Sequence, residues 1–117
     1  MEIQRVDAGA RLSQAVKAGG LVFTVGQVAT RTPGADVVTQ VKDILDQIDG
    51  LLEKTGSSKE LLVSATVYLA DLAHFNDLNS VWDKWVVPGS TPARTTVHAQ
   101  LLSPDYAVEI AVVAAAL

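Results

Sequence analysis

Arg94 and Glu109 are the residues of this chain whose types and setting most clearly suggest chemistry. Each is a single charge in an otherwise apolar, strand-like part of the segment PARTTVHAQLLSPDYAVE. A charge on an apolar strand is costly unless it is paired or used. A guanidinium is a rigid two-pronged donor for a carboxylate, and a glutamate can position a water or accept its proton. Read as two strands joined by a turn at residues 103–105, the segment predicts an antiparallel hairpin that carries both charges.

Residue chemistry alone also allows purely structural roles for these side chains. Arg94 could form a structural ion pair with Glu109 or with a carboxylate at an interface, and Glu109 could be a hydrogen-bonded interface carboxylate. His98 shares the strand phase of Arg94 and Thr96. It could shuttle protons, but we expect a half-exposed strand residue. Arg11 is either a second anion-binding group or an ordinary surface arginine.

The upstream sequence predicts the strands that must position these residues. Residues 3–6 alternate apolar and polar, and residues 13–18 continue in an extended pattern. Gly19-Gly20 then predicts a tight hairpin turn into a β-branched and aromatic strand over 21–28. Gly26 interrupts that strand, which indicates a bulge or the close approach of another backbone or a ligand.

Two amphipathic helices are predicted further along the chain. Asp36 is a suitable N-cap for a helix that Gly56 ends, and a strand follows over 61–69. Asp71 can cap a second helix over 72–86, which includes Trp82 and Trp85 at core spacing. The expected order is therefore β-β-β-α-β-α-β-β, an α+β fold with a single sheet and both helices on one face. The other face is largely apolar, so we expect a closed oligomer to bury it.

The composition and charge of the chain argue against several classes of function. The chain has 117 residues, a net charge of -4, no cysteine and two histidines. Its length predicts one domain, 1–117. The lack of cysteine and the presence of only two histidines argue against a metal site. The acidic balance, without a basic cluster, disfavours nucleic acid as a partner. No transmembrane helix or signal peptide is recognisable, so we expect no membrane partner and a cytoplasmic location.

Several segments resemble one known family over residues 13–115. They are SQAVKAGGLVFTVGQV, the helix end LLEKTGSS, LLVSATVYLADLAHFNDLNSVWDKW, PARTTV and VEIAVVAA. Together they resemble the RidA family, also known as YjgF, whose members are small reactive-intermediate deaminases. The resemblance implies a chorismate-mutase-like fold and a homotrimer with ligand sites between subunits. It also implies hydrolysis of enamines and imines such as 2-aminoacrylate and 2-iminopropanoate to 2-oxo acids and ammonia, with no cofactor and no metal.

The resemblance assigns roles to individual residues. Arg94 matches the arginine that grips the substrate carboxylate, and Glu109 matches the glutamate that helps to hold the attacking water. Thr96 stands where many members have cysteine, and Gly26 matches a glycine beside the site. Leu12 and Val25 stand where many members have a tyrosine and a serine. A wall that includes Leu12, Val25, Phe23 and Val112 would then line the substrate site.

Because Leu12 and Val25 carry no hydroxyl group, the sequence also allows a second function. The chain could be a non-catalytic trimeric protein that binds small carboxylates through the same arginine. A third possibility is the ribonuclease activity with which some relatives are labelled, which the acidic charge balance disfavours.

Overall fold

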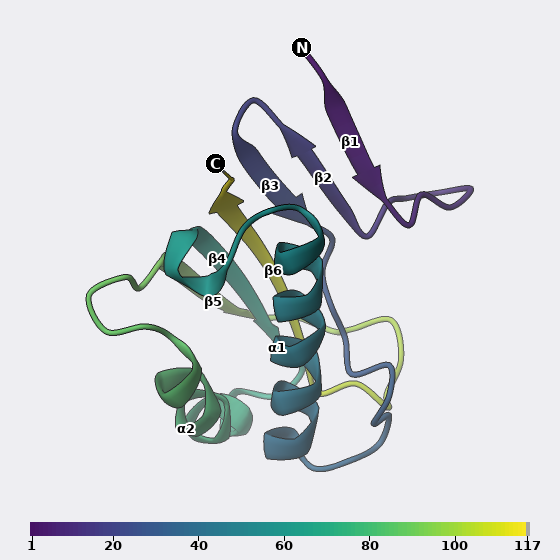
Figure 1. Cartoon of the computed structure of the whole chain (residues 1–117). Helices are drawn as coiled ribbons and strands as arrows, with labels where there is room; N and C mark the ends of the chain where they lie inside the picture. The colour runs from purple at the N-terminus through teal and green to yellow at the C-terminus, as the bar shows by residue number, and fades with distance from the viewer. Residues whose placement is uncertain (117) are drawn as a thin grey trace.

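The computed structural model describes residues 1–116, so the last residue of the expected domain, Leu117, lies outside the described residues. The predicted order of strands and helices is confirmed, with a short 3₁₀ turn before β4 and another before α2. Figure 1 shows their arrangement. The elements are β1 (Ile3–Val6), β2 (Ala15–Ala18), β3 (Leu21–Thr24), α1 (Val37–Lys54), η1 (Lys59–Leu61), β4 (Leu62–Leu69), η2 (Leu72–His74), α2 (Phe75–Trp85), β5 (Ala93–His98) and β6 (Val108–Ala115).

All six strands form one sheet in the order β1-β2-β3-β6-β4-β5. The predicted hairpin of β5 and β6 is wrong, because β4 lies between them and pairs parallel with β5 and antiparallel with β6. Burial explains the difference: Val108, Ile110, Val112 and Ala114 of β6 are all buried, whereas no residue of β5 is fully buried. The more apolar strand takes the centre of the sheet, and the more polar one becomes its edge.

The glycine turn and the cap of α1 are confirmed, whereas Asp71 caps the short turn η2 and α2 begins only at Phe75. Gly19 and Gly20 join β2 to β3 with φ values of 60° and 77°, which side chains disfavour. The Asp36 side chain accepts a hydrogen bond from the Thr39 amide at 2.7 Å and so caps α1. Two strands are shorter than predicted, because β2 begins at Ala15 and β3 ends at Thr24.

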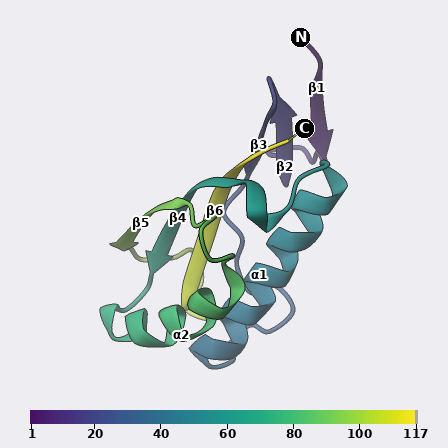
Figure 2. The same cartoon turned by 60° about the vertical axis from the view of Figure 1, so that its left-hand side comes forward.

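Both helices cover the same face of the sheet, as predicted (Figure 2). Helix α1 buries one stripe of residues that includes Ile44, Ile48 and Leu52, and α2 buries Leu78 and Trp82. These side chains form one core with the inward-facing residues of β3, β4 and β6. The helices therefore define a covered face and leave the opposite face of the sheet open.

The open face is largely apolar and uncovered within one chain. Leu21 and Phe23 of β3 are 36% and 45% exposed, and Val97 of β5 is 40% exposed. Ala111 and Val113 of β6 alternate with buried core residues and so point to the same open face. Exposed apolar surface of this extent is unusual on a monomer, and this bears out the expectation of an uncovered apolar face.

Candidate functional site

Arg94 lies on the edge strand β5 with its side chain directed toward α2. Its register partner on β4 is Ala65, a core residue on the helix-covered face, and directly paired residues share a face. The guanidinium carbon lies 5.2 Å from the ring centre of Trp82 and 6.0 Å from that of Phe75. Both distances are within the range at which an aromatic face attracts a cation. The two rings of α2 therefore form an aromatic shelf, Phe75 and Trp82, that supports Arg94.

No carboxylate pairs with Arg94 among residues 1–116. The described ion pairs, with a limit of 4.0 Å, are Arg31 with Asp46 and Lys54 with Asp7. Burial lowers the pKa of the Arg94 guanidinium, and the negative charge of Asp83 raises it by a smaller amount. Arg94 is thus half-buried, and the alternative of an ion pair with Glu109 of the same chain is wrong among the described residues.

Thr96 and His98 share the face of Arg94, as their strand phase predicts. Their register partners on β4 are the buried residues Val67 and Leu69. His98 is exposed, and its Nε2 lies 3.2 Å from the carbonyl oxygen of Ala70. This contact ties the imidazole to the end of β4, and it fits the expectation of a strand residue better than that of a proton shuttle.

Glu109 lies on the other face of the sheet. Its neighbours Val108 and Ile110 are fully buried under the helices, so the Glu109 side chain points to the open face. Its register partner is Tyr68 of β4. Arg94 and Glu109 are therefore on opposite faces, with β4 between their strands. One small ligand cannot touch both side chains of the same chain without passing through the sheet.

Gly26 is the close neighbour of Glu109, as expected for an approach of another chain segment. A Cβ added at Gly26 would overlap Oε2 of Glu109 and lie 2.8 Å from its Cδ. The backbone of Gln27 holds this segment against β6 with hydrogen bonds of 2.8 and 3.0 Å to Ile110. Only a residue without a side chain leaves room for the carboxylate in this position.

A buried glutamine network supports the segment that carries Gly26. The Gln27 side chain is 6% exposed and donates to Gln14 Oε1 at 3.1 Å and to the carbonyl of Val25 at 3.2 Å. Gln47 of α1 donates to Gln27 Oε1 at 3.2 Å. This network links the residue just before β2, the segment beside Glu109 and α1, and the sequence pattern did not predict it. Three polar residues far apart in sequence carry no local signal of such a contact.

The expected apolar wall is only partly assembled. Val25 directly precedes Gly26, and Phe23 lies on the open face with Glu109. Leu12 is 49% exposed in the loop between β1 and β2, and Arg11 beside it is also exposed. Val112 is wrong as a member of the wall, because it is 2% exposed and points into the core under the helices. Its three-residue offset from Glu109 places it on the opposite face.

Phe75 and Trp82 are the site residues that sequence reasoning missed. Helical spacing predicted core packing for Trp82, which is correct at 6% exposure, whereas Phe75 is 42% exposed. The sequence did indicate that the two rings share a helix face, because Phe75 and Trp82 are seven residues apart. That this face meets Arg94 depends on the parallel pairing of β4 and β5, which the sequence did not predict.

The described residues contain no helix long and apolar enough to cross a membrane. Nor do residues 1–116 gather three or more histidine, cysteine, aspartate or glutamate side chains into a group that could hold a metal ion.

A mixed six-stranded sheet with two helices on one face, an edge arginine and an open-face glutamate define a class of small α+β protein. The family model described as Endoribonuclease L-PSP matches residues 2–116. The chain belongs to this family, which includes the RutC and YjgF proteins, and the predicted RidA relationship is confirmed.

The relatives cover nearly the whole chain. The RutC family protein YoaB of Escherichia coli is 44% identical over 115 residues, which is 98% of this chain and 99% of that protein. The structure of NMB1025 from Neisseria meningitidis, a member of the YjgF protein family, has a TM-score of 0.96 and 39% identity, and covers 100% of this chain and 97% of that one. A structure from Salmonella typhimurium, described as a putative translation initiation inhibitor, is 43% identical with a TM-score of 0.87, over 97% of this chain and 96% of that one.

Proposed function

We propose that this protein is a cofactor-independent deaminase that hydrolyses reactive imino acids such as 2-iminopropanoate, the imine form of 2-aminoacrylate, in the cytoplasm. The observation that carries the proposal is Arg94, a half-buried guanidinium on an aromatic shelf with no carboxylate bound to it among the described residues. Such a group is a suitable receptor for the carboxylate of a small substrate. The matching positions in the RidA family give Arg94 and Glu109 the same roles.

The opposite faces of Arg94 and Glu109 favour a site shared between two chains. The open apolar face offers the surface through which copies of the chain would associate, and a homotrimer is the assembly that the family resemblance implies. In such an assembly, Arg94 on the edge strand of one subunit meets Glu109 on the open face of a neighbour. Gly26, Val25, Thr96 and Leu12 then complete the lining from the two sides.

The chemistry needs no group beyond these side chains and water. Arg94 holds the substrate carboxylate and fixes the imine carbon in position. Water held by Glu109 adds to that carbon, and the carboxylate accepts a proton from the water as the C–O bond forms. That proton passes to the imine nitrogen and gives a carbinolamine. The new hydroxyl group then loses its proton, which Glu109 can relay to the amino nitrogen, as the C=O bond forms and the C–N bond breaks, so that ammonia and a 2-oxo acid leave. One imine and one water are consumed for each 2-oxo acid and ammonia formed.

A panel of imino acids generated in situ tests the proposal, with the 2-oxo acid and ammonia as readouts. We expect acceleration over buffer that is lost in Arg94→Ala. Equal rates with and without the protein, for every imino acid in the panel, would reject the deaminase.

The second candidate is a trimeric protein that binds small carboxylates without turnover. It is favoured by Leu12 and Val25, which supply no hydroxyl where many relatives carry a tyrosine and a serine. Glu109→Gln separates the two candidates. If the variant still binds pyruvate in calorimetry but has lost turnover, the protein is a catalyst. If the wild type binds pyruvate and shows no turnover, the binder is correct.

A further inference from the structure

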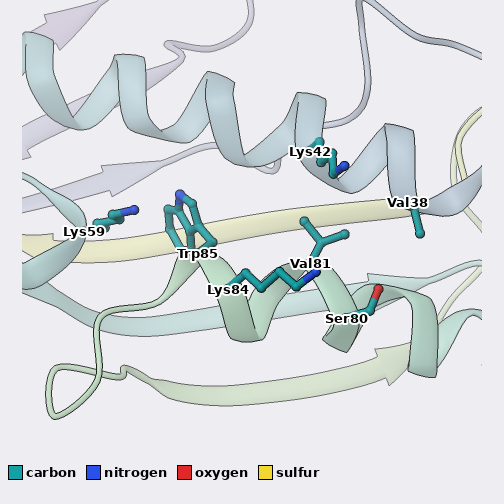
Figure 3. A pocket seen from close by; sticks show the side chains of 7 residues that line it. All are labelled: Val38, Lys42, Lys59, Ser80, Val81, Lys84 and Trp85. Carbon is teal, nitrogen blue, oxygen red and sulfur yellow. The ribbon is translucent and has the colours of Figure 1, made fainter.

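A hollow lies between the two helices, and neither Arg94 nor Glu109 is among its lining residues. It has a volume of about 330 Å³ and is lined by Val38 and Lys42 of α1, Lys59 of η1, and Ser80, Val81, Lys84 and Trp85 of α2. Figure 3 shows these side chains along the seam between α1 and α2. We call it the helix groove. Its volume falls at the lower end of the range for small-molecule sites.

Lysines gather around the helix groove, although the protein as a whole is acidic. Three of the five lysines of the chain line it, although the net charge is -4. No carboxylate is among its lining residues. Three ammonium groups on one small hollow repel one another, and a bound anion would relieve that repulsion.

The described residues offer these lysines no ion pair. Asp46, one helical turn after Lys42 on α1, is bound instead by Arg31 at 2.7 Å. The other described ion pair joins Lys54 to Asp7 and lies outside the groove. Lys59 lies over the Trp85 ring, 5.9 Å from its centre. Lys42 and Lys84 are exposed, and neither forms an ion pair among the described residues.

The floor of the groove is apolar and fixed. Val81 and Trp85 are 8% and 9% exposed, and they form the base between the lysines. The indole N–H of Trp85 donates to the Asp49 carboxylate at 3.1 and 3.2 Å, which holds the ring in place. A rigid apolar base under a cationic rim matches a ligand with a flat apolar body and a negative group at its edge.

We propose that the helix groove binds small amphipathic anions, each with an aromatic or other flat apolar body and a carboxylate or phosphate group. The apolar body lies on Val81 and Trp85, and the anionic group lies between Lys42 and Lys84. Neither Arg94 nor Glu109 lines this groove, so it is a different site from the imine site, although its Trp85 ring lies 5.4 Å from the Trp82 ring that supports Arg94.

The two tryptophans of the chain allow a direct test by ¹H–¹⁵N spectra, in which each indole N–H gives one signal. The probes are 2-naphthoate and 2-naphthyl phosphate, which distinguish a carboxylate from a phosphate, and neutral 2-naphthalenemethanol is the control. Trp82→Phe leaves a single indole signal and so assigns Trp85. We expect a saturable shift of the Trp85 signal with at least one anionic probe, and binding that weakens as salt is added.

Lys42→Gln/Lys84→Gln tests the charge of the groove. We expect it to raise the dissociation constant by about five- to tenfold, since each exposed pair contributes modestly. Lys17→Gln/Lys54→Gln removes the same net charge outside the groove and should leave affinity within about twofold. Arg94→Ala should bind the probe as the wild type does.

Several outcomes would overturn the proposal. One is no saturable Trp85 shift with either anionic probe. A second is equal affinity for the neutral alcohol, and a third is equal affinity of the two lysine double variants. A shift that disappears in Arg94→Ala would assign the probe to the imine site and would also reject the helix groove.

Discussion

Arg94 and Glu109 are held in opposite ways. Arg94 lies on an edge strand, on the helix-covered side, and two rings of α2 support its guanidinium. Glu109 lies on a central strand, on the open side, in space that Gly26 leaves free. The cation is positioned by what packs against it, and the carboxylate by the absence of a side chain beside it. In a single chain, the two side chains therefore face away from each other.

Removal of Arg94 is expected to have the largest effect on activity. Arg94→Ala should lower kcat/KM by about a hundredfold, because a charge-assisted two-pronged contact with the substrate carboxylate is lost. Arg94→Lys is the matched control, since it keeps the charge and loses the fork. Steady-state rates of 2-oxo acid formation measure both. Activity of Arg94→Ala within about twofold of wild type would show that this guanidinium does not hold the substrate.

Disruption of the open face should separate the two half-sites. Phe23→Glu places a charge on a 45% exposed apolar position of that face, and an assembly that buries it becomes unfavourable. We expect monomers in light scattering and activity that falls with the loss of the trimer. Leu72→Glu is the control, because Leu72 is 65% exposed on η2, outside the sheet. A trimer that survives Phe23→Glu with full activity would contradict this use of the open face.

Gly26→Ala should disturb Glu109 selectively. The new Cβ would meet Glu109 Cδ and Cγ at 2.8 and 2.9 Å, so the side chain must move. Because overpacking costs about 1–3 kcal/mol, we expect a comparable loss in the free energy of unfolding. The same change in a Glu109→Ala background should be close to neutral, since the clashing atoms are gone. Equal losses in both backgrounds, measured by urea unfolding, would show that Gly26 serves another purpose.

The aromatic shelf should contribute the smallest effect. Phe75→Leu removes one of the two rings under Arg94 and should raise KM about two- to fivefold, in line with an exposed cation–π contact. Asn76→Ala changes the neighbouring exposed residue and should leave KM unchanged. If Phe75→Leu leaves KM unchanged as well, Trp82 alone is sufficient to support the guanidinium.

The sequence was informative about elements and caps and poor about pairing. Apolar periodicity predicted both helices and every strand, because burial on one face leaves a local pattern. Gly26 was also interpretable, since a glycine inside an apolar strand indicates a close approach. The partner of each strand depends on the whole sheet. Placing β5 beside β6 therefore failed, and the opposite faces of Arg94 and Glu109 could not be foreseen.

The same contrast holds for the candidate site: residue types suggested chemistry, but contacts between distant segments were not predicted. The residue types of Arg94 and Glu109 suggested their chemistry without a structure, as single charges on apolar strands. The sequence did not predict the side chains that position these two residues. Phe75 and Trp82 resemble core positions. The network of Gln14, Gln27 and Gln47 joins segments that are distant in the sequence. Spacing in sequence shows which residues share a strand or helix face, but not which faces meet.

The central claim is that the imine site is shared between two chains, and a mixture of two inactive variants tests it most directly. Arg94→Ala and Glu109→Gln are purified separately, unfolded and refolded together, and the mixed trimers are isolated through two different tags. In a cyclic trimer that contains both variants, about a third of the sites combine an intact Arg94 with an intact Glu109. We predict recovery of about a third of the wild-type rate of 2-oxo acid formation. Mixed trimers with no more activity than either variant alone would contradict a shared site.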